Sequence, residues 1–148
     1  MKTRYHYTES GLNNVWLANG FTIRKTKYGE GVSIRDVDGL HRALALALAN
    51  KPRLTGTEVR FLRKEMGMSQ RSLGGLLGVS EQAVALWERK GRPPKTAERL
   101  LRLIYVEHNN GNVPIVSFIE HLNDLDQQNE DLIIAVEAKG GWKTRLAA

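Results

Sequence analysis

The chain has 148 residues, of which 41% are hydrophobic and 26% charged, and its formal net charge is +6. This length allows one well-packed core, or a core with a small appended unit. The sequence has no run of about 18 apolar residues, so we expect no membrane-spanning helix, and its first residues lack the apolar region of a secretory signal. The absence of cysteine excludes disulfides and thiolate metal sites. It fits the cytoplasmic location that we expect.

The positive charge is concentrated in the middle of the chain. Residues 50–107 contain twelve Lys and Arg against six Asp and Glu, whereas residues 108–148 contain three against six. A basic segment of this kind favours a polyanionic partner, although a solvated surface can show the same excess.

Residues 14–35 predict a small β-meander. Asn19-Gly20 is the dipeptide best suited to a type I′ turn, and it separates two strand-like segments that we expect to form a hairpin. A second turn at residues 28–31 leads into another strand, in which Val32 and Ile34 alternate with polar residues.

A helix is predicted after this meander, with Asp36 or Asp38 as its N-cap and Asn50 near its end. Its leucines at 40, 44 and 48 fall on one side. The expected core of this first unit contains either Trp16 or its two neighbours, Val15 and Leu17. The other core residues that we expect are Phe21, Ile23, Val32 and Leu44.

A second helix is predicted from Thr55, because Thr55 and Glu58 form the T-x-x-E pattern of a capping box. Its apolar stripe comprises Val59, Leu62 and Met66, and its outer face comprises Arg60, Arg63 and Lys64.

Residues 68–90, MSQRSLGGLLGVSEQAVALWERK, predict two short helices joined by a tight turn. Ser69 and Ser80 are N-caps, and Gly78 ends the first helix because glycine adopts a left-handed conformation without a steric cost. Gly74 is small enough for the two helices to approach closely. The expected inner residues are Leu73, Leu76 and Leu77 of the first helix and Val84 and Trp87 of the second.

A further helix begins near Pro94 and has the apolar spacing of a core-facing helix. The inner residues that this spacing predicts are Ala97, Leu100, Leu101 and Ile104. It would complete a compact four-helix bundle with the three helices before it.

The segment QRSLGGLLGVSEQAVALWERKG resembles the helix-turn-helix of the Xre/Cro–CI family of bacterial and phage DNA-binding proteins, and the resemblance extends over about residues 54–105. In that family the Gln that opens the first helix contacts phosphate, which corresponds to Gln70 here. The start and outer face of the second helix read bases.

The residues of the second helix that face away from Val84 and Trp87 are therefore the candidate base readers. Gln82 is the strongest, because its amide can pair with adenine through two hydrogen bonds. Leu86 can contact a thymine methyl, Glu81 can accept from a cytosine amine, and Ala85 lies on the same face. Each of these side chains would otherwise be an ordinary surface residue.

Phosphate contacts are expected around the helix-turn-helix, where they would supply affinity that does not depend on sequence. The candidate residues are Ser69, Gln70, Arg71, Ser80, Arg89, Lys90, Arg92 and Lys95. Trp87 lies beside basic residues, but its spacing from Val84 favours a core position over stacking on single-stranded nucleic acid.

After a break at residues 109–112, residues 114–125 predict a helix with Ile115, Ile119 and Leu122 inward. DLIIAVEA then predicts a strand, although a buried helix can show a similar apolar run, and Lys139-Gly140-Gly141 can turn the chain into a second segment around Trp142. This acidic extension is our candidate for homodimer contacts, the alternative being that it packs only on its own chain.

A ββα unit before such a helix-turn-helix is similar in layout to the MqsA/YgiT-type antitoxins. That resemblance implies an N-terminal unit that engages a toxin and a C-terminal unit that binds operator DNA as a dimer. The zinc cysteines of that family have no counterpart here, so a zinc site and toxin binding do not carry over.

Nothing in the sequence indicates catalysis or a cofactor. The four histidines, His6, His41, His108 and His121, lack metal-ligand spacing, and there is no phosphate-binding loop or nucleophile motif.

We therefore predict a mainly α (α+β) fold with a β-containing unit at 1–50, a helix-turn-helix domain at 51–108 and an extension at 109–148. The predicted function is a DNA-binding transcriptional regulator, either a repressor or an autoregulating antitoxin, that acts as a homodimer on a palindromic operator in double-stranded DNA. The alternative is a protein-interaction module that neutralises a toxin or bridges other factors.

Overall fold

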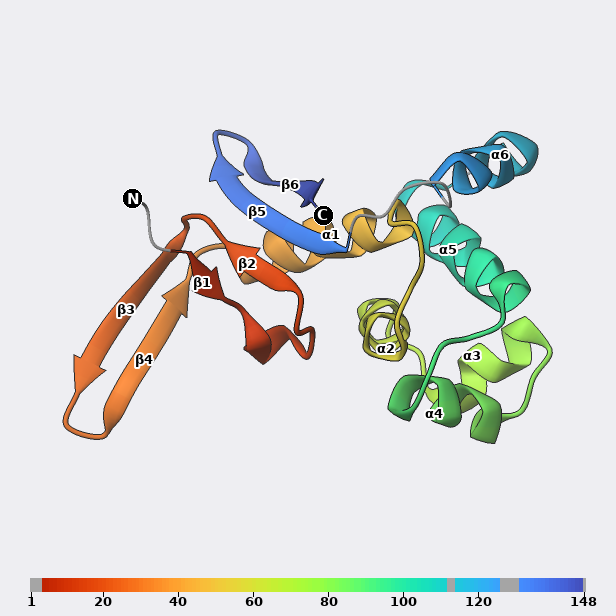
Figure 1. The fold of residues 1–148 in the computed structure, drawn as a ribbon, viewed down its shortest axis with the longest axis horizontal. Coiled ribbons are helices and arrows are strands. Elements are labelled where there is room, and N and C mark those ends of the chain that lie inside the picture. The colour runs from red at the N-terminus through yellow and green to blue at the C-terminus, as the bar shows by residue number, and fades with distance from the viewer. Residues whose placement is uncertain (1–3, 112–113, 126–130, 148) are drawn as a thin grey trace.

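The computed structural model describes residues 4–111, 114–125 and 131–147. Its helices are α1 (Val37–Ala49), α2 (Gly56–Glu65), α3 (Gln70–Leu77), α4 (Glu81–Arg89), α5 (Lys95–Asn110) and α6 (Ile115–Leu125). Its strands are β1 (Tyr5–His6), β2 (Val15–Leu17), β3 (Phe21–Thr26), β4 (Gly29–Ile34), β5 (Leu132–Ala138) and β6 (Gly141–Ala147). The predicted α+β fold is confirmed, with a helical bundle at one end and the strands at the other (Figure 1).

The main sheet joins the two ends of the chain. Its strand order is β1-β2-β5-β6, and β2 runs parallel to β5, with Val15 opposite Ile133. The strand and turn predicted for residues 131–147 are confirmed as the antiparallel pair β5–β6. Ile133 and Ala135 are completely buried, because this strand pairs on both edges and packs against α1. The division of the chain at 50/51 and 108/109 stays a prediction.

The hairpin predicted across Asn19-Gly20 is wrong, because β2 and β3 belong to different sheets. The Asn19 side chain bonds instead to the backbone of Glu137 in β5, accepting from its N–H at 2.7 Å. A Cβ on Gly20 would lie 2.4 Å from the Trp142 ring, so this glycine lets the chain pass close to β6. The pairing with a strand more than a hundred residues away replaces the local turn.

The second predicted hairpin is present as the two-stranded sheet β3–β4, joined by Lys27 and Tyr28. Its strands project away from the rest of the molecule (Figure 1). Ile23 was predicted to be in the core and is 46% exposed, because no other element covers this ribbon. Val15 and Leu17 are the buried neighbours of a half-buried Trp16.

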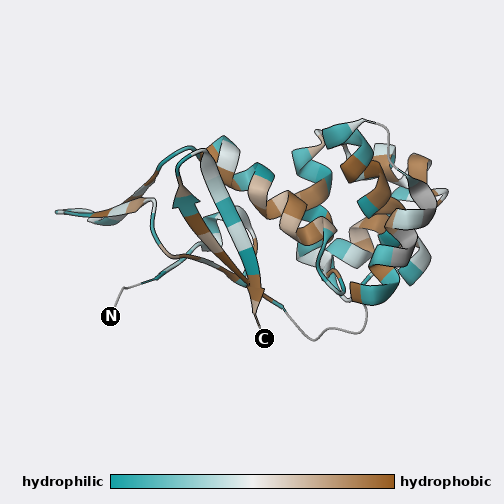
Figure 2. Cartoon of the chain, turned by 90° about the horizontal axis from the view of Figure 1, so that it is seen from above, coloured by the Kyte–Doolittle hydropathy of each residue, from teal (hydrophilic) through white to brown (hydrophobic). Residues whose placement is uncertain are grey.

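Helix α1 connects the sheet to the bundle. Asp36 is its N-cap and accepts a hydrogen bond from the Gly39 N–H at 3.1 Å. Leu40, Leu44 and Leu48 are completely buried, as their spacing predicts. Figure 2 shows apolar residues where α1 enters the bundle, and α1 contacts α2 and α5 as well as β5 and β6.

The bundle begins with the predicted capping box. Thr55 accepts from the Glu58 N–H, and Glu58 accepts from the Thr55 N–H at 2.8 Å. Val59, Leu62 and Met66 are buried as expected.

The buried face of α5 is rotated from the predicted one. Leu101 is buried, but Leu100 is 36% exposed, so its predicted inner position is wrong. Glu98 and Arg102 lie on the buried face, where they form an ion pair at 2.5 Å. An ion pair on the inner face is invisible to an apolar pattern.

Helix α6 packs against α5, and Leu122 is buried as predicted. The side chains of Ile115 and Ile119 lie outside the described residues. Among the helices described, none combines the length and apolar character that a membrane crossing requires.

Candidate nucleic-acid interface

Helices α3 and α4 are bounded by the residues that the sequence predicts. Ser69 accepts from the Ser72 N–H at 3.0 Å, and Ser80 accepts from the Ala83 N–H at 3.1 Å. Gly78 ends α3 in the left-handed conformation, with φ of 73°. These two caps and the glycine fix a short turn between the helices.

The approach of the two helices depends on Gly74. A Cβ at this position would lie 2.8 Å from the carbonyl oxygen of Val79, in the turn. Leu73 and Val84 are completely buried between the helices, and Trp87 is half-buried. Leu76 is 53% exposed, so its predicted inner position is wrong: it points away from the face that carries Leu73.

The outer face of α4 carries the four predicted base readers. Glu81 and Gln82 are exposed, Leu86 is 48% exposed and Ala85 is half-buried. In Figure 1, α4 lies at the lower edge of the bundle, away from α6, β5 and β6. This face is therefore left uncovered by the strands and by the described residues of the acidic extension, 114–125 and 131–147.

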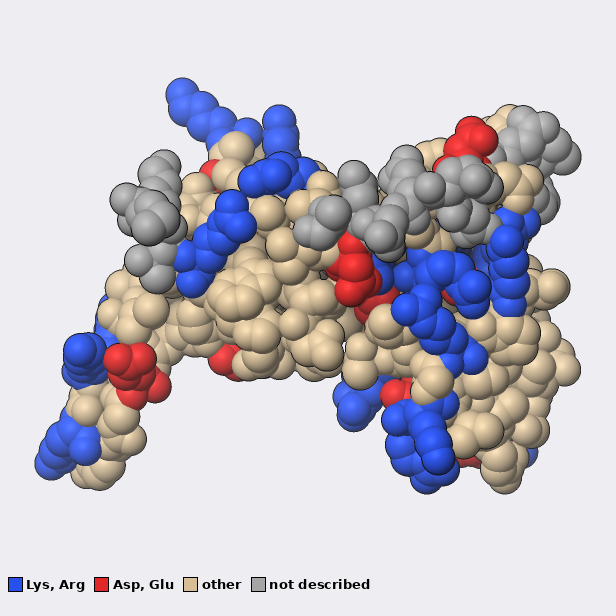
Figure 3. All heavy atoms as spheres, viewed as in Figure 1, with Lys and Arg blue, Asp and Glu red and all other residues tan. Residues whose placement is uncertain are grey.

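Basic residues surround that face. Arg71, at the start of α3, is exposed, and so is a group at the end of α4 and just beyond it in sequence. That group comprises Arg89, Lys90, Arg92 and Lys95. Figure 3 shows Lys and Arg side chains gathered at the lower end of the bundle. Such an arrangement creates a positive potential around a protruding helix.

A buried ion pair holds α2 against α4. Arg63 donates to Glu88 through two nitrogens, at 2.6 and 2.9 Å. The prediction that Arg63 lies on the outer face of α2 is wrong, since only 8% of this residue is exposed. Hydrogen bonding to Glu88 raises the pKa of Arg63 above its ordinary value despite its desolvation, so the Arg63 guanidinium stays protonated. Glu88 follows the buried Val84 by four residues, and this spacing could have indicated a buried carboxylate.

Gln70 is engaged in the same network. Its side-chain amide donates to Glu88 at 3.1 Å, and the residue is half-buried at the start of α3. An amide nitrogen carries two hydrogens, so one remains for a phosphate oxygen. The phosphate role of Gln70 stays a prediction, and Glu88 orients the group that would perform it.

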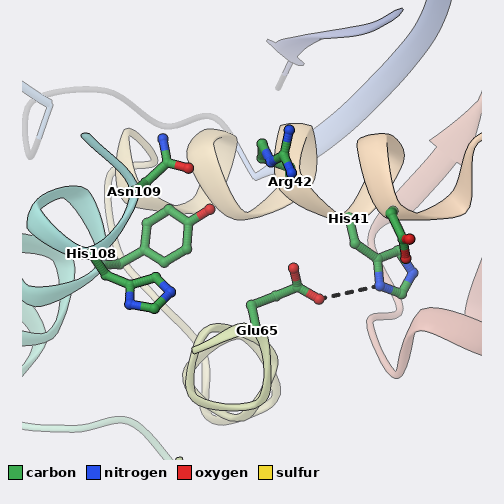
Figure 4. A pocket seen from close by; sticks show the side chains of 7 residues that line it. His41, Arg42, Glu65, His108 and Asn109 are labelled. Carbon is green, nitrogen blue, oxygen red and sulfur yellow. Dashed lines mark hydrogen bonds and ion pairs between the residues drawn. The ribbon is translucent and has the colours of Figure 1, made fainter. Parts of the chain in front are cut away.

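A cavity of about 550 Å³ lies elsewhere, between α1, α2 and α5. His41 and His108, which are far apart in sequence, both line it with Glu65 (Figure 4). His41 bonds through both ring nitrogens, to Tyr7 at 2.8 Å and to Glu65 at 3.3 Å. The His41 side chain therefore joins α1 to α2 and to Tyr7, the residue that follows β1.

The charges around this cavity are mixed. Burial, with the nearby Glu65 carboxylate, raises the pKa of Tyr105, whereas Arg42 lowers it. Within the described residues, no three His, Asp or Glu side chains are grouped as ligands for a metal ion. The lining of the cavity thus carries both signs of charge.

Comparison with known proteins agrees with this geometry. Residues 59–104 match the family model described as helix-turn-helix. No curated protein and no solved structure matches the chain. The matched residues run from α2 into α5 and include both helices of the motif. The chain therefore carries, at residues 59–104, a helix-turn-helix of the Xre/Cro–CI type, the fold of DNA-binding regulators.

Proposed function

We propose that the protein is a sequence-specific transcriptional regulator that inserts α4 into the major groove and represses the promoter to which it binds, its own included. The observation that carries this proposal is the outer face of α4. That face is uncovered, it presents an amide at its first turn, and exposed cations flank it. A helix fits the major groove, where each base pair shows its own donor and acceptor pattern.

Base reading is assigned to α4 residues near its N-terminus. Gln82 would pair with adenine, a contact that discriminates by about 1–3 kcal/mol. Leu86 lies one turn further along the same face and would contact a thymine methyl, while Ala85 allows close approach. Glu81 would accept from a cytosine amine. Val84, at 0% exposed, keeps this face turned outward.

Phosphate contacts would fix the helix in the groove. Ser69, Gln70 and Ser80 lie at the N-termini of α3 and α4, where free N–H groups favour an anion. Arg71 and Arg89 are exposed at the start of α3 and the end of α4. Lys90, Arg92 and Lys95 extend the basic surface beyond α4.

We also propose that the protein binds as a homodimer to a palindromic operator in double-stranded DNA. One helix-turn-helix offers few base contacts, and two-fold dimers place two such helices about 34 Å apart on the duplex. Much of the apolar area of β5 is buried within its own chain. We therefore expect the dimer contact on α6 and on the outer edges of the main sheet. Analytical ultracentrifugation of the protein without DNA would measure its stoichiometry.

Two single variants separate base reading from phosphate binding. After selection of bound duplexes from a random pool, Gln82→Ala should change the preferred base at one position per half-site and cost about 1–3 kcal/mol on the wild-type sequence. Lys90→Ala should weaken binding to all duplexes alike and reduce the salt slope by about one. Equal effects of both variants on specific and non-specific duplexes would contradict the assignment.

The second candidate function is neutralisation of a protein partner, such as a toxin. The observation that favours it is the unit formed by α1 and the main sheet, which lies away from α4 and is not needed for groove reading (Figure 1). Co-purification of a stoichiometric small protein would support this function. Unchanged DNA binding by Gln82→Ala would support it over the proposed one, and a reporter fused to the protein's own promoter tests repression directly.

A further inference from the structure

The β3–β4 ribbon is exposed along nearly all of its length. It stands apart from the main sheet and projects beyond it (Figure 1). All residues from Thr22 to Gly31 are exposed, and Tyr28 at the tip is 89% exposed. A two-stranded ribbon by itself is marginally stable in water, so a partner that covers it would stabilise it.

The pairing register gives the ribbon two different faces. On one face the cross-strand pairs are Thr22–Ser33, Arg24–Gly31 and Thr26–Gly29. On the other they are Phe21–Ile34, Ile23–Val32 and Lys25–Glu30. The first face, which we call the Arg24 face, thus combines hydroxyls, two glycines and one unopposed guanidinium. The second face has apolar pairs at its base and a pair of opposite charges near its tip.

Gly31 has no structural role that the fold explains. A Cβ there would meet nothing within 4 Å, and its φ lies outside the left-handed region, unlike that of Gly29, which is 119°. Glycine inside a strand weakens it, and it often marks a position that another molecule approaches closely. Together with Arg24 directly opposite, Gly31 leaves a shallow surface with a cation in it.

The base of the ribbon is held firmly to the main sheet. Trp142 donates from its indole nitrogen to the carbonyl oxygen of Arg35 at 3.1 Å. The Arg35 guanidinium also pairs with Glu137 of β5 at 3.1 Å. The ribbon therefore leaves the molecule in a set direction.

The main sheet is in turn held firmly to the bundle. Asn14 donates to Glu58 at 2.9 Å, and Glu58 accepts from the buried Lys51 at 3.1 Å. Asn14 precedes β2, Lys51 follows α1, and Glu58 lies in α2. This cluster joins the main sheet to α2, which packs against α4.

The ribbon and α4 lie at opposite ends of the molecule and both extend to its lower edge, with a concave underside between them (Figures 1 and 3). Basic side chains appear at both lower ends in Figure 3. Helix α1, which lies between the two ends, is about 20 Å long at 1.5 Å per residue. The ribbon's six-residue strands add a similar length. Laid end to end, these two elements measure about 40 Å, which is comparable to one 34 Å turn of DNA.

We propose that the Arg24 face of the β3–β4 ribbon is a second DNA-binding element, which lies in a groove of the same duplex beside the site that α4 reads. This inference rests on the proposed function and extends it. The major groove admits a two-stranded ribbon as well as a helix. Between Phe21 and Ile34 the ribbon carries three cations and one acid, which suits a polyanion.

The chemistry of each group on this face follows from its position. Arg24 would donate to a guanine edge or to phosphates, and the hydroxyls of Thr22 and Ser33 would donate to phosphate oxygens. Gly31 would let the sugar-phosphate backbone approach the ribbon. Lys27 at the tip would contact the outermost phosphate.

The test compares two duplexes that contain the same sequence selected from a random pool. One is trimmed to the half-sites in which Gln82→Ala changes the preferred base, and the other has about 20 additional base pairs on each side, roughly two turns. Arg24→Gln should weaken binding to the long duplex about tenfold and to the trimmed one hardly at all. Lys25→Gln removes the same charge from the opposite face and is the matched control, with an expected effect below about threefold.

A second variant separates binding from folding. Gly31→Val adds a β-branched side chain to a strand position with open space around it, so it should keep or raise the thermal midpoint. It should nevertheless weaken binding to the long duplex by about fivefold or more, because the backbone could no longer approach. Hydroxyl-radical footprinting of the wild-type protein should show DNA protection beyond the selected site. This extra protection should be lost with Arg24→Gln and with Gly31→Val.

The outcomes distinguish this inference from the function on which it rests. Suppose that Gln82→Ala changes specificity, but Arg24→Gln weakens binding to the long duplex no more than Lys25→Gln does. Then α4 binds DNA and the ribbon does not. If Gly31→Val binds the long duplex as tightly as the wild type, the ribbon inference is overturned as well. If no duplex is selected at all, both the regulator function and the ribbon inference are wrong.

Discussion

Glu88 is the single residue that connects stability to the candidate interface. Its carboxylate accepts two hydrogen bonds from Arg63 of α2 and a third from Gln70 of α3, although it belongs to α4. Three helices are thus joined at one buried charge. Because the same residue orients Gln70, its loss would affect both folding and phosphate binding.

We expect Glu88→Ala to lower the free energy of unfolding by about 3–5 kcal/mol, because the Arg63 guanidinium would remain buried without its partner. Urea denaturation followed by circular dichroism would measure the change. Glu107→Ala, at an exposed position of α5, is the control and should change stability by less than about 0.5 kcal/mol. A loss below about 1 kcal/mol for Glu88→Ala would show that Arg63 finds another partner or water.

At the scale of elements, the close approach of α3 to α4 depends on only one of the two adjacent glycines in α3. Gly74 faces the backbone of the turn, whereas a Cβ on the adjacent Gly75 would meet nothing within 4 Å. Both lie in the same helix and neither has a positive φ. The two positions therefore differ in packing alone.

Gly74→Ala should destabilise the protein by about 1–3 kcal/mol, because its methyl group would push the Val79 carbonyl and reorient α4. Gly75→Ala should stabilise it by about 0.5–1 kcal/mol through helix propensity. Thermal unfolding of both variants would measure the difference, and DNA affinity should fall only for Gly74→Ala. Equal stability changes would contradict the crossing geometry described here.

At the scale of the whole molecule, β5 makes the N-terminal unit dependent on the end of the chain. Ile133 lies opposite Val15 in a parallel pair, and both are completely buried. Strands β5 and β6 also contact α1. The sheet, α1 and the ribbon base should therefore unfold together.

Ile133→Ala should lower the free energy of unfolding by about 2–5 kcal/mol, since it leaves a cavity in the core. Amide hydrogen exchange should speed up in β2 and α1, which are more than eighty residues away in sequence. Ile23→Ala, on the exposed ribbon, is the matched control and should cost less than about 1 kcal/mol. Faster exchange confined to β5 and β6 would mean that these strands form a separate unit.

The sequence by itself determined the helix ends and the helix faces that depend on neighbouring residues within the bundle and α1. The caps at Ser69, Ser80 and Thr55, the stop at Gly78 and the leucine face of α1 were all predicted correctly. Each is made within one helix or one turn, so its signal lies within a few residues. The helix-turn-helix could be identified for the same reason.

Only the tertiary structure decided which distant segments meet. It paired β2 with β5 instead of β3, because Asn19 bonds across to Glu137 and the apolar β5 needs a partner on each edge. It also buried Arg63, since a charge can enter the core once Glu88 of another helix neutralises it. Local periodicity records burial by apolar groups and carries no signal for a partner elsewhere in the chain. The ribbon's independence from the main sheet, and the direction in which it projects, follow from those distant contacts alone.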